Sequence, residues 1–293
     1  MKLVRYGEVG RERPGLMDGS GRVRNLSAIV SDITGDTVTP ARLAELRQLD
    51  PESLPMVNAE VRLGACVGNV RNFYGVGRNY LDHAEETKMD LPKEAVLFNK
   101  ATSCIVGPDD DVMIPRSATK VDAEVELAVV IGTAAYDVAE EDALRYVAGY
   151  CVCNDLSERA WQLEGTGNTV KGKSAPTFGP LGPWLVTTDE VQDPQQLQIF
   201  LDVNGQRRQT GHTSAMIFGV KHLVAFASRF MTLLPGDVLA TGTPSGVGLT
   251  MKPPVFLKPG DVVRLGVERL GEQTQTCVAP PDPDYGAGRP RCP

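Results

Sequence analysis

The chain has 293 residues, of which 42% are hydrophobic and 23% are charged, and its net charge is −7. This globular composition predicts one or two domains with a core that needs no disulfide bridges. The acidic balance argues against broad nucleic-acid binding, because phosphate contacts need a basic surface. The longest apolar run, Leu127–Ile131, is far shorter than the roughly 18 residues that span a bilayer, so no membrane partner is expected.

Residues 1–10 contain no apolar targeting segment, and the six cysteines are scattered without a Cys-x-x-Cys pair. We therefore expect a cytoplasmic protein with free thiols. Glycine (30) and proline (21) together exceed their usual share of about 12%, which predicts many turns. Because the chain has only three histidines, any metal site is expected to use oxygen ligands.

The first part of the chain, residues 1–65, is expected to form a small N-terminal domain. A short strand is predicted at Val23–Leu26, and Thr39 with Pro40 predicts the start of a helix. Leu43 and Leu46 give that helix its apolar face. This segment carries no residues whose pattern indicates chemistry.

Residues 66–278 are expected to form the larger domain, and the Pro/Gly-rich residues 279–293 a disordered tail. Strands dominate the pattern, and helices do not alternate with them regularly. This favours an α+β fold over a doubly wound sheet. The elements predicted in this part are a short helix at 81–86, a strand at 123–131, a helix at 138–147 capped by Asp137, a strand at 150–153, a helix at 159–164, a hairpin turn at Asn204–Gly205, a helix at 215–231, and turns at 235–237 and 259–261.

One string, Gly167–Ser174, fits the phosphate-loop pattern GxxxxGK[ST]. That loop must follow a strand and open a helix, whose N-terminus then binds phosphate. Here the preceding residues predict a helix, and Pro176 and Pro180 exclude a helix interior after the string. Nucleotide binding is therefore kept only as a distant alternative.

Two carboxylates, Glu124 and Glu126, are predicted on one face of a strand. A solvated strand face is the commoner explanation, but Leu127–Ile131 is apolar without alternation, which indicates a buried strand. Two like charges at about 4 Å repel each other by roughly 4 kcal/mol at an effective dielectric of 20. A divalent cation between them would replace this repulsion with attraction. Asp155 follows the next strand and either caps a helix or joins the pair. Three carboxylates favour Mg²⁺ or Mn²⁺.

A second polar pair is His83 with Glu86, which are neighbours at i and i+3 if the segment is helical. Such a pair is usually a surface contact, but Glu86 can also orient the imidazole and raise its basicity. His212 and His222 have no comparable partner in the sequence and are expected to be polar surface residues.

Taken in order, several strings resemble the fumarylacetoacetate hydrolase family over about residues 70–275. The small N-terminal part is similar to that of two-domain bacterial members, which include sugar-acid diketo hydrolases. The segments that carry the resemblance are Gly77–Glu86, Glu124–Glu126, Asn154–Arg159, Lys171–Ser174, Gln209–Phe218 and Leu234–Gly248.

The resemblance implies a mixed β-sandwich roll that is usually dimeric and holds one Mg²⁺ or Mn²⁺. Two departures from the family pattern flank the active-site lysine: Pro176 replaces an Asp found in many close members, and Gly167–Thr169 lacks an aromatic residue. By position, the matching residues are Glu124, Glu126 and Asp155 as metal ligands, His83 and Glu86 as the lid dyad, Lys173 as the active-site lysine, and Gln162, Thr243 and Arg78 as residues of the substrate pocket.

These residues lead to a hypothesis of hydrolysis at the C3–C4 bond of a 2,4-dioxo acid, either an acylpyruvate or a 2,4-diketo-3-deoxy sugar acid. His83 would be the general base, Lys173 and Gln162 would stabilise the oxyanion, and Thr243 would bind the 1-carboxylate. The sequence leaves open decarboxylation of oxaloacetate, tautomerisation, and isomerisation or hydration of a dienoate at the same site. A relative that kept the fold and lost activity is a further alternative, although all three carboxylates and the dyad are present.

Overall fold

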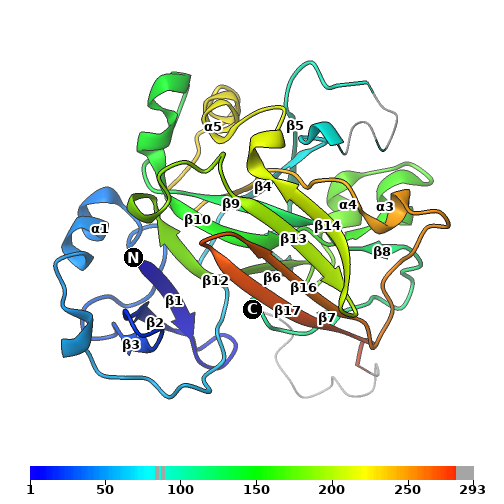
Figure 1. Cartoon of the computed structure of the whole chain (residues 1–293). Helices are drawn as coiled ribbons and strands as arrows, with labels where there is room; N and C mark the ends of the chain where they lie inside the picture. Colours follow the sequence, from blue (N-terminus) through cyan, green and yellow to red (C-terminus); the bar gives the residue numbers. More distant parts are fainter. Residues whose placement is uncertain (83–85, 87–89, 282–293) are drawn as a thin grey trace.

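Two β-sheets packed against each other form the body of the molecule (Figure 1). The computed structural model describes residues 1–82, 86 and 90–281, and the statements below refer to these residues. The larger sheet has ten strands and the smaller has five, with β13, β16 and β17 packing across β9, β10 and β12. Helices are few and short, so the predicted α+β class is confirmed.

The larger sheet is mixed, with parallel pairing of β15 to β4 and of β6 to β12. Its central strands are buried on both faces, as the unbroken apolar run in β9 predicts. In spatial order the strands are β3 (Val23–Asn25), β2 (Arg13–Met17), β1 (Lys2–Tyr6), β12 (Gly179–Thr187), β10 (Val147–Asn154), β9 (Val125–Ile131), β15 (Val238–Ala240), β4 (Phe73–Gly77) and β5 (Val96–Lys100), and β6 (Ile105–Val106) also pairs with β12.

The N-terminal strands continue the larger sheet. Leu3 pairs with Leu185 across β1 and β12, so the β1–β3 meander lies at one end of the molecule in Figure 1 and extends the same sheet. Leu3, Leu16 and Leu26 belong to the same apolar core as the strands of the larger part.

The smaller sheet is antiparallel except for its edge strand β7. The predicted hairpin is confirmed, because Asn204 (φ 52°) and Gly205 (φ 74°) form the two-residue turn between β13 and β14. The predicted turns at 235–237 and 259–261 are also present, with Gly236 and Gly260 at positive φ. In spatial order the strands are β14 (Gln206–His212), β13 (Gln198–Val203), β16 (Val262–Val267), β17 (Gly271–Val278) and β7 (Val112–Met113), while β8 (Val121–Asp122) and β11 (Ser157–Glu158) form a separate pair.

The helices connect strands at the ends of the sheets. Leu81, Asp82 and Glu86 are helical, whereas His83 of the predicted dyad lies outside the described residues. The α-helices with printed bounds are α1 (Pro40–Leu46), α3 (Arg159–Leu163), α4 (Thr169–Lys173) and α5 (Val220–Ser228), and the 3₁₀ helices are Pro51–Ser53, Thr102–Cys104, Glu140–Tyr146, Thr188–Glu190, Thr213–Ala215 and Gly248–Thr250.

Two predicted helices are wrong in type or extent. Asp137 does not cap an α-helix but has left-handed backbone (φ 47°), and a 3₁₀ helix begins after Ala139, because the chain must enter β10 at Val147. The helix predicted from residue 215 begins at Val220, since Ile217 instead donates its N–H to the Asn79 carbonyl oxygen.

The described cysteines form no disulfide and are buried, as expected for free thiols. Cys292 and the predicted tail from residue 282 lie outside the described residues. Within the described part of the chain, no helix is long and apolar enough to cross a membrane.

Candidate metal and substrate site

Three carboxylates meet where β9 begins and β10 ends. Glu124 directly precedes β9, Glu126 lies within it, and Asp155 follows β10, which pairs antiparallel with β9. One oxygen from each of the three lies within 4.8 Å of the other two, and all three residues are buried. The structure thus brings together the three residues that the sequence analysis grouped.

Three cations surround this acidic cluster. Lys173 Nζ donates to Glu124 Oε2 at 2.8 Å and also to Asp155 Oδ2. Lys100 Nζ lies 2.5 Å from Asp155 Oδ1, and Arg159 donates to Glu124 Oε1 at 2.5 Å. Both oxygens of Glu124 and of Asp155 therefore contact a cationic side chain.

Glu126 is the carboxylate with the least compensation among the three. The hydrogen bond described for it comes from the Gly242 N–H, at 2.7 Å from Oε2. Burial and the nearby Asp155 and Glu124 raise the pKa of Glu126 well above its usual value. Burial alone would lower the pKa of Lys173, but Asp155 and Glu124 outweigh burial and raise it, so Lys173 stays protonated.

This donor set fits a hard divalent cation. All three groups are carboxylates, which Mg²⁺ and Mn²⁺ prefer. One oxygen from each carboxylate lies within 4.8 Å of the other two, so all three can contact one ion. A bound cation would also relieve the charge repulsion that raises the pKa of Glu126.

Lys100 and Arg159 were not assigned a role from the sequence. Lys100 ends β5 and is 2% exposed, and its ammonium also donates to the carbonyl oxygens of Leu156 (3.3 Å) and Phe178 (2.8 Å). Arg159 links Glu124 to Asp122, whose Oδ2 accepts from its Nε at 3.0 Å. The only signal for Lys100 in the sequence is a lysine at the end of an apolar strand, and many surface strands end in the same way.

The structure does not give Gly167–Ser174 the strand–loop–helix context that a phosphate-binding loop requires, as the sequence analysis expected. Thr169–Lys173 is itself the helix α4, capped by the Asn168 side chain, and the element before it is the helix α3 rather than a strand. Lys173 lies in the last turn of α4 and points to the acidic cluster. Pro176, one departure from the family pattern, is exposed just beyond this helix.

Thr243 and Gln162 already have partners within the protein. The Thr243 hydroxyl donates to the Val125 carbonyl oxygen at 2.9 Å and accepts from Gln209 at 2.8 Å, so in this arrangement its proton is not available to a substrate. Gln162 Oε1 accepts from Arg159 at 3.1 Å. Arg78, the third residue assigned to the pocket, follows β4 with left-handed backbone (φ 54°) and is half-buried.

The segment that carries the predicted dyad is held against the glycine-rich loop after β15. Asp82 accepts from the Ser245 N–H (3.2 Å) and hydroxyl (2.8 Å). Glu86 accepts from the Gly246 N–H at 3.1 Å. Since His83 lies outside the described residues, its contact with Glu86 stays a prediction.

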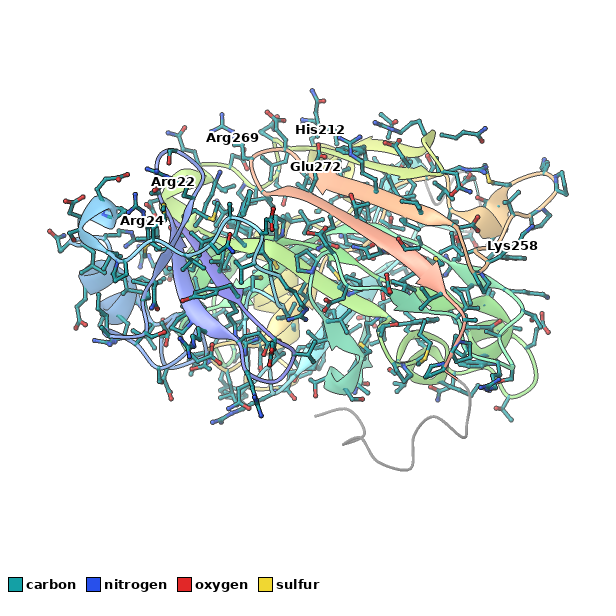
Figure 2. The ribbon with its side chains drawn as sticks, turned by 90° about the horizontal axis from the view of Figure 1, so that it is seen from below. Arg22, Arg24, His212, Lys258, Arg269 and Glu272 are labelled. Atoms are coloured by element: carbon teal, nitrogen blue, oxygen red, sulfur yellow. The ribbon has the colours of Figure 1, made fainter. Side chains whose placement is uncertain are left out.

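The other two histidines lie outside the acidic cluster. Figure 2 shows His212 at the margin of the molecule, where Nδ1 pairs with the Ser214 hydroxyl at 2.7 Å. His222 is half-buried between the rings of Phe218 and Phe226 and contacts Glu140 at 3.0 Å. His222 therefore stacks between two phenylalanine rings, whereas the sequence analysis expected a polar surface residue.

Comparison with known proteins identifies the family. The model of the fumarylacetoacetate hydrolase C-terminal domain matches residues 72–278. A Burkholderia lata protein with a provisional hydrolase name is 58% identical over 276 residues, which cover 94% of this chain and 98% of the relative. The chain therefore belongs to the fumarylacetoacetate hydrolase family, as the sequence analysis expected.

Two solved structures show the range of reactions among similar proteins. Maleylpyruvate hydrolase from Sphingobium sp. SYK-6, in complex with manganese(II) and pyruvate, is 29% identical with a TM-score of 0.80. The 5-carboxymethyl-2-hydroxymuconate delta-isomerase of Mycobacterium smegmatis is 31% identical with a TM-score of 0.74. Each comparison covers 96% of this chain and 100% of the other chain.

Proposed function

We propose that this protein is a divalent-metal-dependent hydrolase that cleaves the C3–C4 bond of a 2,4-dioxo acid, releasing pyruvate and a carboxylic acid. The observation that carries the proposal is the buried cluster of Glu124, Glu126 and Asp155, in a chain similar to a hydrolase that binds manganese and pyruvate. An acylpyruvate or a 2,4-diketo-3-deoxy sugar acid has the required dioxo unit. The active form is proposed to be a homodimer.

Glu124, Glu126 and Asp155 would hold Mg²⁺ or Mn²⁺, which supplies a Lewis acid for the oxygens of the 2-oxo acid. The Lys173 ammonium has three N–H donors, and two of them are directed at Glu124 and Asp155. The third can donate to an oxyanion. Gln162 Oε1 accepts from Arg159, so the Gln162 amide nitrogen can donate a second hydrogen bond to the same oxyanion.

His83, oriented by Glu86, is the proposed general base. It takes a proton from water, and the hydroxide adds to the C4 carbonyl carbon. The C3–C4 bond then breaks with its electron pair going to C3. The proton held by His83 finally returns to C3, which gives pyruvate and the carboxylic acid.

A second candidate function, isomerisation or decarboxylation of a 2-oxo acid, uses the same cluster. Isomerisation needs only proton transfer, whereas decarboxylation breaks the C3–C4 bond, releases CO₂ and leaves the electron pair on C3, which then takes up a proton. The similarity to the Mycobacterium smegmatis isomerase favours keeping it. The two functions separate at water addition, which only hydrolysis requires. They therefore differ in their products, and decarboxylation, which begins with the loss of CO₂, does not require His83 as a base.

The test is a substrate panel with Mg²⁺ or Mn²⁺ and product identification by NMR. It includes an acylpyruvate, a 2,4-dioxo sugar acid, oxaloacetate and 5-carboxymethyl-2-hydroxymuconate. Hydrolysis of a dioxo acid is expected to stop with EDTA and to fall at least about a hundredfold in Glu126→Gln. The exposed Glu164→Gln is the matched control and should retain full activity.

Undiminished turnover after EDTA treatment and in Glu126→Gln would overturn the metal assignment. His83→Ala should keep Mn²⁺ binding and lose hydrolysis by about 10²–10⁴-fold. Oxaloacetate decarboxylation that survives in His83→Ala, with no hydrolysis in the wild type, would instead establish the second function.

A further inference from the structure

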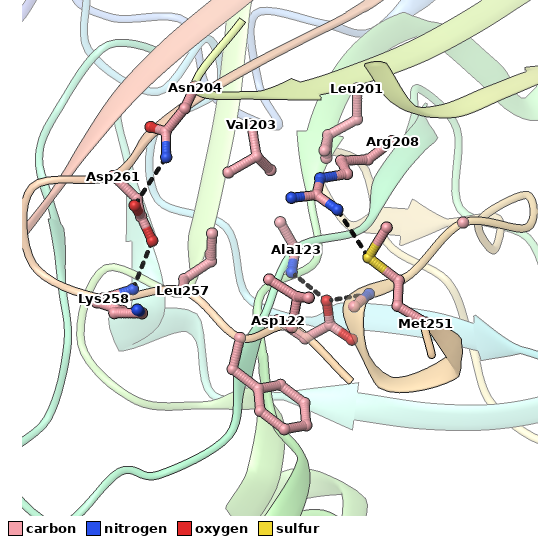
Figure 3. A pocket seen from close by; sticks show the side chains of 14 residues that line it. Asp122, Ala123, Leu201, Val203, Asn204, Arg208, Met251, Leu257, Lys258 and Asp261 are labelled. Atoms are coloured by element: carbon pink, nitrogen blue, oxygen red, sulfur yellow. Dashed lines mark hydrogen bonds between the residues drawn. The ribbon is translucent and has the colours of Figure 1, made fainter. Parts of the chain in front are cut away.

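A cavity of about 170 Å³ lies between the smaller sheet and the loop after β15. None of Glu124, Glu126, Asp155 and Lys173 lines it. We call it the Arg208 cavity, after the residue that enters it from β14 (Figure 3). Its apolar wall consists of Leu201, Val203, Met251, Val255, Phe256 and Leu257.

Arg208 is a half-buried cation with little compensation in this apolar setting. Its guanidinium points into the cavity, and the hydrogen bond described for it runs to the Met251 sulfur at 2.9 Å (Figure 3). A guanidinium carries five N–H donors, and a thioether is a weak acceptor. Among the described residues no carboxylate forms an ion pair with Arg208.

The two carboxylates that also line the cavity are already occupied. Asp122 accepts the N–H groups of Gly248 (2.8 Å) and Leu249 (3.1 Å) and pairs with Arg159. Asp261 accepts from the Lys258 N–H at 2.8 Å and from the Asn204 amide at 2.9 Å, on the far side of the cavity in Figure 3. Within the described part of the chain, the cavity therefore contains a cation without an ion-pair partner, whereas both of its carboxylates already have hydrogen-bond partners.

We propose that the Arg208 cavity binds a small organic carboxylate with an apolar body about the size of one ring. The planar guanidinium of Arg208 pairs with the carboxylate through two parallel hydrogen bonds. The apolar wall covers the ring, and a cavity of about 150 Å³ is known to accept benzene. Val255 lines the cavity and is also exposed, so the cavity wall reaches the surface of the protein.

The cavity borders residues that reach the acidic cluster. Asp122 contacts Arg159, which donates to Glu124, and the Gly246 N–H at the cavity margin donates to Glu86. A ligand in the cavity therefore lies next to two contacts of the proposed catalytic machinery without entering it. This site is distinct from the one where the dioxo acid is proposed to react.

The experiment is a ¹⁹F NMR titration of the full-length protein with 4-fluorobenzoate, with 4-fluorobenzamide as the uncharged control. Saturable millimolar or tighter binding is expected for the carboxylate and at least about tenfold weaker binding for the amide. Arg208→Met should weaken carboxylate binding by a similar factor. Arg207→Met is the matched control, because Arg207 pairs with Asp202 and contacts the Phe200 ring instead, and it should bind within about twofold of wild type.

Val203→Phe, which fills the cavity, should also abolish binding, and circular dichroism checks that each variant is folded. Glu126→Gln should bind the probe as wild type does, with or without EDTA. Binding that is lost in Glu126→Gln and retained in Arg208→Met would place the probe at the acidic cluster and overturn the proposal. No saturable binding to wild type, or equal binding of the amide, would overturn it as well.

Discussion

Lys100 is a charged residue whose side chain is buried, so we expect its substitution to lower the stability of the protein. Its ammonium lies between Asp155 Oδ1 and the carbonyl oxygens of Leu156 and Phe178. Removing one partner of a buried ion pair leaves the other charge without compensation, and this costs more than the pair itself contributes. The carbonyl oxygens would also lose a donor in the interior.

We therefore predict that Lys100→Met lowers the free energy of unfolding by about 3 kcal/mol. This is the lower end for a broken buried pair, because Lys173 still contacts Asp155. Urea unfolding monitored by circular dichroism in EDTA measures the change. Lys171→Met, on the exposed side of α4, should change it by less than about 0.5 kcal/mol. Equal urea midpoints for Lys100→Met and wild type would show that Lys100 makes no net contribution to stability.

The position of Lys100 also shows what the sequence could not predict. Glu124, Glu126 and Asp155 were predictable, because the period of two in a strand and the pairing of consecutive strands are local properties. Lys100 lies four strands away from Asp155 in the order β10, β9, β15, β4 and β5. In a flat sheet that distance is about 19 Å, so their contact requires a curled sheet, which no local pattern encodes.

At the scale of elements, the approach of α3 and α4 depends on a glycine. A Cβ at Gly172 would lie 2.5 Å from Gln162 Cβ and 2.8 Å from its backbone nitrogen. Because Lys173 is the next residue, this close approach also fixes the position of its side chain relative to the acidic cluster. Gly172, the second glycine of the phosphate-loop string, is therefore explained by the packing of α3 against α4 rather than by nucleotide binding.

Gly172→Ala is predicted to destabilise the protein by about 1–3 kcal/mol, despite the better helix propensity of alanine, because the clash is with the Cβ and backbone atoms of Gln162, which cannot rotate away. It should also change Mn²⁺ affinity, as measured by calorimetry, because the displaced Lys173 contacts two of the three carboxylates. Gly19→Ala, where no atom lies within 4 Å of the added Cβ, is the control and should leave both unchanged. A Gly172→Ala variant as stable as this control would show that α4 shifts without cost.

A second element, the turn between β2 and β3, depends on Asp18. Its side chain accepts from the Ser20 hydroxyl, the Arg22 N–H (2.9 Å) and Arg24 Nε (2.8 Å), and these contacts lower the pKa of Asp18. A carboxyl group with a lowered folded-state pKa contributes stability above its unfolded pKa of about 3.9. That contribution is lost as the pH falls through the folded-state pKa.

Asp18→Asn is therefore predicted to destabilise the protein at pH 7 and to differ less from wild type near pH 3. Urea midpoints at both pH values measure the two differences. The exposed Asp36→Asn is the control and should match wild type at pH 7. A difference between Asp18→Asn and wild type that stays constant between the two pH values would contradict a charge-dependent role.

At the scale of the whole molecule, we propose that residues 1–65 and 66–278 are two units of the sequence. Strand β1 pairs with β12, so the larger sheet runs through both units. Leu3, Leu16 and Leu26 pack into one core with the strands of the second unit. Removing the first unit would expose an edge of β12 and part of this core to solvent, which favours aggregation.

We predict that residues 66–293 alone aggregate or lack a cooperative thermal transition, as seen by size-exclusion chromatography and near-UV circular dichroism. The matched control is the full chain with a protease site inserted at Ala59–Glu60, both of which are exposed. After cleavage its two pieces should elute together and unfold in one transition, because the cut leaves the β1–β12 pairing intact. A shortened chain that elutes as a single folded species, with a cooperative transition near that of the full protein, would establish residues 66–293 as an independent folding unit. The N-terminal strands would then be an addition to a complete sheet rather than part of its stability.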